Sequence, residues 1–387
     1  MKVSRPRSGT LFLSTGATDV TVNDVLGLLT AWAPKEVAWE RDNVGLQVGD
    51  GNAEVFRICV CLDVTEAVVA EAARKKADLI ISHHPLLFRP PKAVTRGDEI
   101  GRCVQALVKH NISLVSAHTN LDFTRNGTSF AIANALNLRN VGFLHTPYQV
   151  QKKIVTFVPE SHLDRVRNAM AEAGAGVIGN YDHCSFGMQG TGSFRGNAQA
   201  RPVLGTKERL EFVTEVRLEM IAEQWNVPRI IAALKAAHPY EEVAYDIYPL
   251  DNAHSNYGMG IIGELARPVP LERFLRLVKA RLGAGALRYC VGPQKAVQRV
   301  AACGGSGAEL IDSAIAQHAD AFITADVKYH DFHHAKGRIV LIDAGHFETE
   351  HPVVQTVVEY LRQELKNHNG RVAVFASQTP TNPVSYL

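Results

Sequence analysis

The chain carries the same run of strands and helices twice, and this internal repeat constrains its fold more than any other feature. Residues 299–330 (RVAACGGSGAELIDSAIAQHADAFITADVKYH) align without gaps, through the second strand, on residues 57–85 (RICVCLDVTEAVVAEAARKKADLIISHHP). Asp78 then stands opposite Asp320. Continuous apolar strands that alternate with helices are typical of mostly parallel sheets covered on both faces. The repeat therefore predicts an α/β fold built from two similar lobes.

The repeat continues into a third strand with one inserted residue. SLVSAHTNLD in the first half matches VLIDAGHFETE in the second, which sets His118 opposite His346 and Asp122 opposite Glu350. Each half thus offers a histidine followed four residues later by a carboxylate. Because ligands of such sheets bind beyond the carboxyl ends of the strands, we expect these side chains to lie at a site there.

The segment between the two lobes has a different pattern. Residues 153–251 predict the order strand, helix, Gly-rich hairpin, strand, helix and strand, with the hairpin in SFGMQGTGSFRGN. This β-α-β-β-α-β order indicates an inserted ferredoxin-like α+β domain. We therefore predict a loose leader over residues 1–20, a first α/β lobe over 21–150, the inserted domain over 151–255 and a second α/β lobe over 256–387.

The composition excludes several classes of protein. Lys plus Arg is 41 and Asp plus Glu is 39, so the net charge of +2 and the 7% aromatic content give no reason to expect nucleic acid as a partner. The six cysteines include no CxxC pair, which favours reduced thiols and a cytoplasmic location. No apolar stretch approaches the roughly 20 residues that span a membrane, so we expect no membrane partner.

The stretch ISHHPLLF, residues 81–88, ends a buried strand in two adjacent histidines and a proline. Successive strand residues point to opposite sides, so His83 and His84 can share a site only where the strand opens into a loop. Pro85 favours this, because it lacks an amide hydrogen and restricts His84 to an extended conformation. On the dipeptide alone, a packed and hydrogen-bonded core histidine explains His83 equally well.

Metal binding gains weight from what else is predicted at the same sheet edge. Asp122 follows one strand, and His346 with Glu350 follows another at the turn that enters a helix, where a spacing of four puts both on one side. Imidazole and carboxylate ligands without thiolates argue against a closed structural zinc site. Five such ligands suit two Zn, Mn or Fe ions with open positions for water.

Six stretches together resemble the NGG-interacting-factor-three-like family, some of whose members are named GTP cyclohydrolase I type 2 homologues. They are RDNVGLQVG, ISHHP, SAHTNLD, ITADVKYHD, GHFETE and TNPVSYL. The resemblance implies a dinuclear metal centre between two α/β lobes, with Glu350 shared by both metals and a toroidal homohexamer as the assembly. It implies the ligands His83, His84, Asp122, His346 and Glu350. Residues 153–251 are similar to the PII/CutA-like insertion of longer bacterial members.

Other residues near the predicted site leave more than one interpretation open. His118 is a candidate for a further metal ligand, for a partner that holds a ligand, or for the group that moves protons, and His330 is a candidate general acid or base. A purely structural role explains each about as well. Asp63 either holds a ligand histidine or caps the following helix. Asn43 either orients groups of the pocket or forms a turn. The glycines of CGGSGAEL, residues 303–310, either bind a phosphate or form a tight turn.

Two functions from different classes follow. The first is a metal-dependent hydrolase acting on a nucleotide-like substrate, and the name of the resembling proteins points to GTP ring opening, which consumes water and releases formate. The second is a non-catalytic protein that binds metal for regulation, delivery or sensing, with the inserted domain providing either trimer contacts or a gate for a small molecule. Whether the chain is an enzyme is left open, since no motif in it is specific for a purine.

Overall fold

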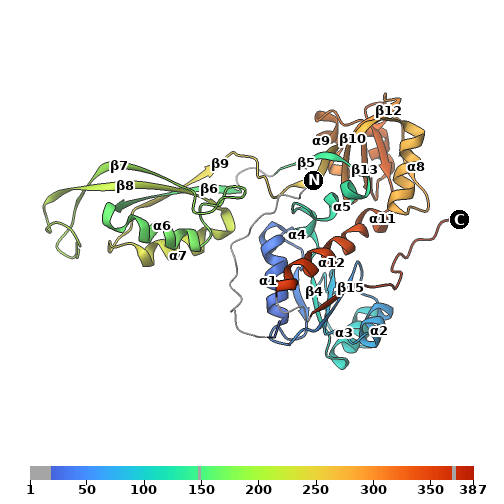
Figure 1. Ribbon diagram of the computed structural model, residues 1–387, viewed down its shortest axis with the longest axis horizontal. Helices are drawn as coiled ribbons and strands as arrows, with labels where there is room; N and C mark the ends of the chain where they lie inside the picture. Colours follow the sequence, from blue (N-terminus) through green and yellow to red (C-terminus); the bar gives the residue numbers. More distant parts are fainter. Residues whose placement is uncertain (1–18, 147–149, 368–371) are drawn as a thin grey trace. The chain divides into compact units, whose positions relative to one another are not determined.

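The computed structural model describes residues 19–146, 150–367 and 372–387. Of the predicted leader, residues 1–18 lie outside the described part, and Val20 is buried in the core. The described residues divide into two compact units, one formed by 150–255 and one by 19–146 together with 256–387. The second unit, called the core below, contains two sheets with helices packed on them (Figure 1).

The first core sheet has the strand order β1-β4-β3-β2-β15. Its strands are β1 (Gly45–Val48), β2 (Arg57–Cys61), β3 (Leu79–Ser82), β4 (Ser113–Ser116) and β15 (Ala373–Ala376). All neighbours are parallel except β1 and β4. Because every residue of β3 and β4 is buried, both faces of the sheet must be covered, as the apolar runs of the sequence predict.

Four helices cover the faces of the first core sheet. They are α1 (Val22–Trp32), α2 (Glu66–Arg74), α3 (Glu99–Lys109) and α12 (Pro352–Glu364). Ile58 and Val60 of β2 belong to the apolar cluster that contains residues of α1 and α12, whereas Cys59 and Cys61 belong to the cluster that contains residues of α2 and α3. Alternate side chains of β2 thus point to opposite faces of the sheet and pack into two separate apolar clusters.

The second core sheet has the order β11-β14-β13-β12-β10-β5. Its strands are β5 (Arg139–His145), β10 (Met259–Pro270), β11 (Arg288–Cys290), β12 (Ala296–Ser306), β13 (Ala321–Ala325) and β14 (Val340–Asp343). Strands β12, β13 and β14 are parallel, and the other pairs are antiparallel. Its helices are α5 (Thr128–Ala135), α8 (Leu271–Leu282), α9 (Ile311–Ala316) and α10 (Tyr329–Ala335).

The two copies of the repeat have the same local structure at matching positions. The carboxylate of Asp78 accepts the amide hydrogens of Phe56 and Arg57 at 2.8 Å, and that of Asp320 accepts those of Gln298 and Arg299 at 2.8 Å. Asp78 therefore holds the start of β2, and Asp320 holds the matching residues of β12, which begins two residues earlier, at Ala296. The turns before them also match, because Lys76 and His318 both adopt a positive φ, 54° and 55°.

The unit formed by residues 150–255 is a four-stranded antiparallel sheet of order β7-β8-β6-β9 with two helices. Its elements are β6 (Gln151–Pro159), α6 (Leu163–Glu172), β7 (Ser185–Arg195), β8 (Leu210–Glu223), α7 (Val227–Ala237) and β9 (Tyr245–Leu250). The chain order β-α-β-β-α-β is ferredoxin-like. The Gly-rich stretch differs from the hairpin that the sequence predicts, since it forms the single strand β7, which pairs with β8 along its whole length.

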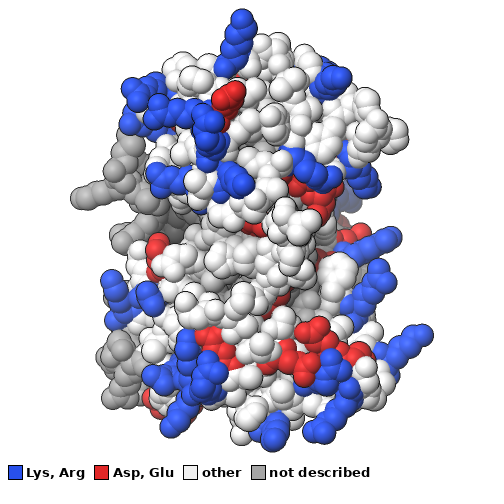
Figure 2. Space-filling view, turned by 90° about the vertical axis from the view of Figure 1, so that its right-hand side faces the viewer, with Lys and Arg blue, Asp and Glu red and all other residues white. Residues whose placement is uncertain are grey.

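Charged side chains are distributed unevenly on the core. On the face that Figure 2 shows, which is the side of the C-terminus in Figure 1, Lys and Arg gather toward the upper and lower ends, and uncharged surface lies between them. No continuous positive stripe crosses this face of the described residues. None of the helices formed by the described residues has both the length and the apolar character needed to cross a bilayer.

Candidate metal centre

The first core sheet delivers four of the predicted site residues at the carboxyl ends of its parallel strands. His83 and His84 directly follow β3, and His118 follows β4 after one intervening residue. The chain then turns into the short helix α4 (Thr119–Asp122), whose last residue is Asp122. This is the sheet edge at which ligands of α/β folds bind.

The second core sheet delivers two of the remaining predicted residues on one turn of helix. The helix α11 (His346–Glu350) follows β14, begins at His346 and ends at Glu350. Gly345 before it has a φ of 94°, a conformation that L side chains rarely adopt. Four residues apart on the helix, the two side chains meet, with His346 Nε2 at 3.1 Å from Glu350 Oε2.

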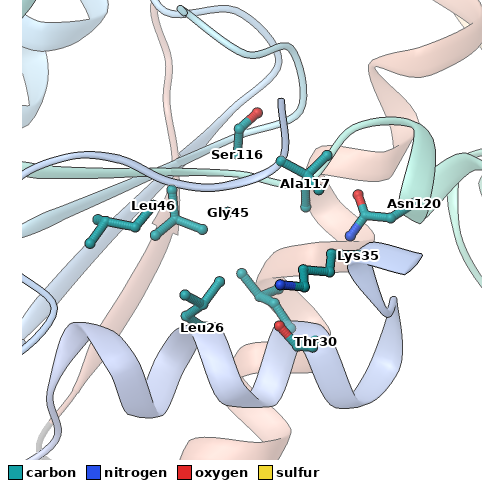
Figure 3. A pocket seen from close by; sticks show the side chains of 11 residues that line it. Leu26, Thr30, Lys35, Gly45, Leu46, Ser116, Ala117 and Asn120 are labelled. Atoms are coloured by element: carbon teal, nitrogen blue, oxygen red, sulfur yellow. The ribbon is translucent and has the colours of Figure 1, made fainter. Parts of the chain in front are cut away.

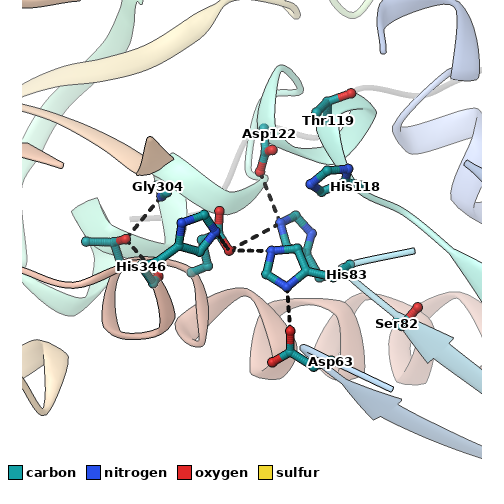
Figure 4. A network of polar contacts seen from close by, with 12 residues as sticks. Asp63, Ser82, His83, His118, Thr119, Asp122, Gly304 and His346 are labelled. Carbon is teal, nitrogen blue, oxygen red and sulfur yellow. Dashed lines mark hydrogen bonds and ion pairs between the residues drawn. The ribbon is translucent and has the colours of Figure 1, made fainter. Parts of the chain in front are cut away.

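Four of the predicted ligands converge on the fifth, the buried carboxylate of Glu350 (Figure 4). Its Oε2 atom lies 2.9 Å from His84 Nε2, 3.1 Å from His346 Nε2 and 3.9 Å from His83 Nε2. Asp122 Oδ1 lies 3.4 Å from His83 Nε2. Residues that are far apart in the sequence thus present nitrogen and oxygen atoms to one small volume.

These residues form two groups that share Glu350. One group is His83, Asp122 and Glu350, the other is His84, His346 and Glu350, and within each group the ligand atoms lie within 4.8 Å of one another. His118 forms a third group of the same dimensions with His83 and His84. A carboxylate common to two ligand sets has the position of a bridge between two cations.

Three atoms of the site fit a cation because they are buried and have no hydrogen-bond partner in the described part of the chain. They are His83 Nε2, Asp122 Oδ1 and Glu350 Oε2. Buried polar atoms are almost always satisfied, since leaving one unpaired costs about 1–3 kcal/mol. Because all three face the same volume, a divalent ion there would satisfy them together.

All four histidines of the site are held by their Nδ1 atoms. The acceptors are the Ala117 carbonyl for His83 at 2.9 Å, Asp63 for His84 at 2.7 Å, Asp42 for His118 at 2.9 Å and Asp326 for His346 at 2.6 Å. An acceptor at Nδ1 keeps the proton there and leaves the Nε2 lone pair free. This is the arrangement that orients histidine ligands of metals in proteins.

The surroundings of the ionisable groups in the site shift their pKa values in different directions. Burial raises the pKa of Asp122 to about 7, with the charge of Glu350 adding to the effect. Burial also lowers the pKa of His83 to about 3, which keeps this imidazole neutral. Glu350 has a pKa well below its usual range, because the neighbouring imidazoles of His346 and His84 outweigh its burial. The contacts of these two imidazoles with Glu350, Asp63 and Asp326 in turn outweigh their burial and raise the pKa of His84 to about 10 and that of His346 to about 9. Anionic Glu350 and neutral His83 are in the protonation states that bind metal, whereas His84 and His346 would each release a proton when an ion binds.

The two candidates for proton transfer lie in different surroundings. The His118 ring centroid is 5.3 Å from that of His83 and 5.4 Å from that of His84, so His118 belongs to the cluster. His330 is exposed on α10, where its ring contacts Tyr329 and His333, and it is in none of the ligand groups. The structure therefore brings His118, and not His330, to the other predicted residues.

The structure also places the residues whose roles the sequence left open. Asp63 holds His84, and the cap of α2 is Thr65, whose side chain accepts the Val68 amide hydrogen. Asn43 lies beside the site and donates its side-chain amide to the Leu87 carbonyl.

Sequence reasoning missed two carboxylates that hold histidines of the site. Asp42 stands next to Asn43 in RDNVGLQVG, and its carboxylate also accepts the Thr119 amide hydrogen at 3.0 Å. Its bonds to His118 and to Thr119 outweigh its burial and hold its pKa at about 2. Asp326 stands opposite His84 in the repeat. That correspondence is the signal that would have found Asp326, because the position at the end of the second strand faces the site in both halves.

The glycines of CGGSGAEL serve the packing of Glu350. A Cβ on Gly305, where φ is 62°, would lie 2.2 Å from Glu350 Oε1. The amide hydrogens of Gly304 and Gly305 are donated to the hydroxyls of Ser129 and Thr349. The interpretation as a phosphate loop is therefore wrong for these two amides, because both amide hydrogens are already donated to hydroxyls of the protein and are not available to a phosphate.

A cavity of about 340 Å³ lies apart from the ligand atoms, and α1, β1 and β4 supply most of its lining (Figure 3). Its wall is largely apolar, and the side chain of Lys35 extends along it. None of the five predicted ligands lines it. Three residues of its lining contact the centre: the Ala117 carbonyl holds His83, the Ser116 hydroxyl donates to the His83 carbonyl, and the Asn120 side chain accepts the His118 amide hydrogen.

Comparison with known families matches the whole core and the unit between its halves. The sequence model of Duf34/NIF3 (NGG1p interacting factor 3) matches residues 20–383. The chain belongs to the Duf34/NIF3 family. This confirms the family membership that the six sequence stretches predict. The mixed α/β fold with several sheets is the fold of the NIF3-related proteins.

Relatives of this Duf34/NIF3 protein cover nearly its full length. A Halalkalibacterium halodurans protein named "GTP cyclohydrolase 1 type 2 homolog" is 37% identical over 365 residues, 94% of this chain and 98% of the relative. A Listeria innocua protein of the same name is 41% identical over 358 residues, 92% of this chain and 95% of the relative. The crystal structure of a Bacillus cereus protein related to NIF3 is 37% identical with a TM-score of 0.81, covering 96% of this chain and all of that one.

Proposed function

We propose that this Duf34/NIF3 protein holds two divalent metal ions, Zn, Mn or Fe, in one dinuclear centre between its two α/β lobes and is a metal-dependent hydrolase acting on a nucleotide-like substrate. One observation carries the proposal: two groups of possible ligands share Glu350, and three buried atoms of these groups have no hydrogen-bond partner among the described residues. The names of the relatives support a substrate of the GTP type. The five ligands are those predicted from the sequence.

The chain's own residues supply binding, orientation and proton transfer. Two divalent ions, when bound, would polarise a substrate oxygen and lower the pKa of water toward neutrality. Glu350, with an oxygen near the histidines of both ligand groups, would be a ligand common to the two ions. The Nδ1 acceptors keep the four imidazoles pointing inward. Such preorganisation spares the site any rearrangement during the reaction.

His118 is the residue we expect to move protons. Asp42 holds its Nδ1 atom, and its ring lies against two ligand histidines without belonging to either group that contains Glu350. Replacing it with glutamine (His118→Gln) should lower kcat by roughly 10²- to 10⁴-fold, the usual contribution of a general acid or base, with the metal content unchanged.

The matched control for His118→Gln is His330→Gln. His330 is the other candidate of the sequence and lies exposed on α10. Steady-state kinetics and metal analysis of both variants separate the two roles. Equal losses of kcat in the two variants, or full activity of His118→Gln, would remove His118 from the mechanism.

The hydrolase proposal is tested by metal content and turnover of the wild-type protein. Protein loaded separately with Zn, Mn or Fe is analysed by mass spectrometry and then offered a panel of nucleotides that includes GTP, with formate and phosphate release as readouts. We expect two ions per chain and metal-dependent turnover of at least one nucleotide. Two ions with no turnover on any substrate would favour the non-catalytic metal-handling function, and no bound ion would exclude both.

The assembly is the remaining part of the proposal. The family resemblance predicts a toroidal homohexamer of the 42.3 kDa chain. Light scattering coupled to size-exclusion chromatography should give six times the mass of one chain. A monomer or dimer at micromolar concentration would contradict the prediction.

A further inference from the structure

The C-terminal segment over residues 377–386, called the strap below, follows β15 and contacts three carboxylates of the core. It contains part of the stretch TNPVSYL, to which neither the fold nor the ligand set assigns a role. The three carboxylates belong to Glu71, Asp63 and Glu348. Of these, Asp63 also touches a histidine of the candidate metal centre.

The strap begins at a buried anchor in the first core sheet. Glu71 of α2 is 2% exposed, and its carboxylate accepts the hydroxyls of Ser377 and Thr379 at 2.6 Å each. The same carboxylate accepts the amide hydrogens of Gln378 and Thr379. Four bonds to one carboxylate fix the first three residues of the strap.

The middle of the strap reaches the metal centre through one hydroxyl. Thr381 Oγ1 donates to Asp63 Oδ2 at 2.8 Å, and Asp63 Oδ1 accepts from His84 Nδ1 at 2.7 Å (Figure 4 shows the second bond). The two oxygens of Asp63 thus have one partner each. The carboxylate of an aspartate rotates easily about its Cβ–Cγ bond. The hydrogen bond from the Thr381 hydroxyl therefore fixes the plane of the Asp63 carboxylate and with it the direction of its bond to the His84 imidazole.

The end of the strap contacts the helix that carries the ligands of the second half. Asn382 Nδ2 donates to Glu348 Oε1 at 3.1 Å, and Glu348 lies on α11 between His346 and Glu350. The Tyr386 ring packs against Gly285, where a Cβ would come within 2.1 Å of the ring. The strap therefore connects the two halves of the core beside the centre.

We propose that Thr381 is a positioning residue of the metal centre, and that it acts through Asp63 to orient His84. The inference rests on the proposed metal binding and adds to it a residue outside the ligand set. Partners of this kind typically contribute 10- to 100-fold to the affinity for metal. Loss of the Thr381 hydroxyl should therefore weaken metal binding at the group that contains His84.

The test compares the same substitution at two positions of the strap. Thr381→Val and Thr379→Val each remove one hydroxyl bonded to a carboxylate, but only Asp63 touches a histidine. Zinc affinity is measured by competition with a chromogenic chelator, and the visible spectrum of the cobalt-loaded protein reports the ligand geometry. Thermal unfolding of each metal-free variant monitors the fold.

We expect Thr381→Val to weaken zinc binding by about 10- to 100-fold and to change the cobalt spectrum. We expect Thr379→Val to leave both unchanged, and Thr381→Ser, which restores a hydroxyl, to bind zinc like the wild type. Three results would overturn the role of Thr381 without affecting the proposed metal binding. They are wild-type zinc affinity in Thr381→Val, an equal loss of zinc affinity in Thr379→Val, and failure of Thr381→Ser to recover wild-type zinc affinity. A wild-type protein that binds neither zinc nor cobalt would overturn the proposed function and this inference with it.

Discussion

Replacing Glu350 with glutamine is expected to abolish binding of both metal ions, because this one carboxylate serves both ligand groups. Its Oε2 atom is buried and lies within 3.1 Å of a ring nitrogen of both His84 and His346. Glutamine has the same shape but lacks the charge, and its NH₂ group repels a cation. The loss should exceed the roughly 10- to 100-fold effect of an outer partner such as Thr381.

Metal content per chain after gel filtration, measured by mass spectrometry, checks this prediction. Glu359→Gln is the control, because it removes the same charge from the following helix α12, where Glu359 bonds only Gln355 among the described residues. We expect two ions per chain in the wild type and the control and none in Glu350→Gln. Retention of one ion by Glu350→Gln would mean that Glu350 serves a single site, and retention of both would exclude it as a bridge.

The sequence predicts the fold well where the chain repeats itself. The three strands of the first copy of the repeat are β2, β3 and β4, and those of the second copy are β12, β13 and β14, of which β12 begins three residues before the repeat, at Ala296. Apolar runs are informative because strands buried on both faces are apolar throughout. The Gly-rich stretch misled us because glycine signals a turn locally, whereas pairing with β8 keeps β7 extended.

The sequence predicts which side chains come together at the site. It predicts less well which residues hold those side chains by hydrogen bonds. The five ligands follow strand ends, and strand ends of parallel sheets meet at one edge. Asp42 contacts His118, which lies 76 residues later in the chain. Thr381 contacts Asp63, which lies 318 residues earlier. No local spacing encodes such contacts. His330 shows the opposite error, since its strand ends at the expected edge but the residue itself lies on the exposed α10.

Replacing Glu71 with alanine is expected to lower the free energy of unfolding of the core by about 1–3 kcal/mol, the range for leaving hydrogen-bonding groups without their partner. Glu71 bonds Lys75 Nζ at 2.7 Å in addition to the four donors of the strap. Alanine would leave these partly buried donors without their charged acceptor, and bonds to a charged group contribute more than those between neutral groups. Urea denaturation at pH 7, followed by the fluorescence of the buried Trp32, measures the difference.

Glu66→Ala is the matched control, because Glu66 lies on the same helix and pairs with Arg102 at 2.7 Å on the surface. Exposed pairs contribute at most about 1 kcal/mol, so the control should remain close to the wild type. A loss in Glu71→Ala no larger than in the control would show that solvent replaces the carboxylate and that the strap is not anchored there.

The stability that Glu71 contributes should also depend on pH in a predictable direction. Burial by itself raises its pKa, but the bonds from Lys75, Ser377 and Thr379 outweigh it and hold the pKa well below the ordinary 4.5. A carboxylate with a lowered pKa in the folded state stabilises fully above its ordinary pKa and loses this contribution as the pH falls toward the lowered value. The gap between the wild type and Glu71→Ala should therefore be constant from pH 7 to about 5 and shrink below the ordinary pKa of 4.5. A gap that widens on acidification would contradict the charged state of Glu71 in the folded protein.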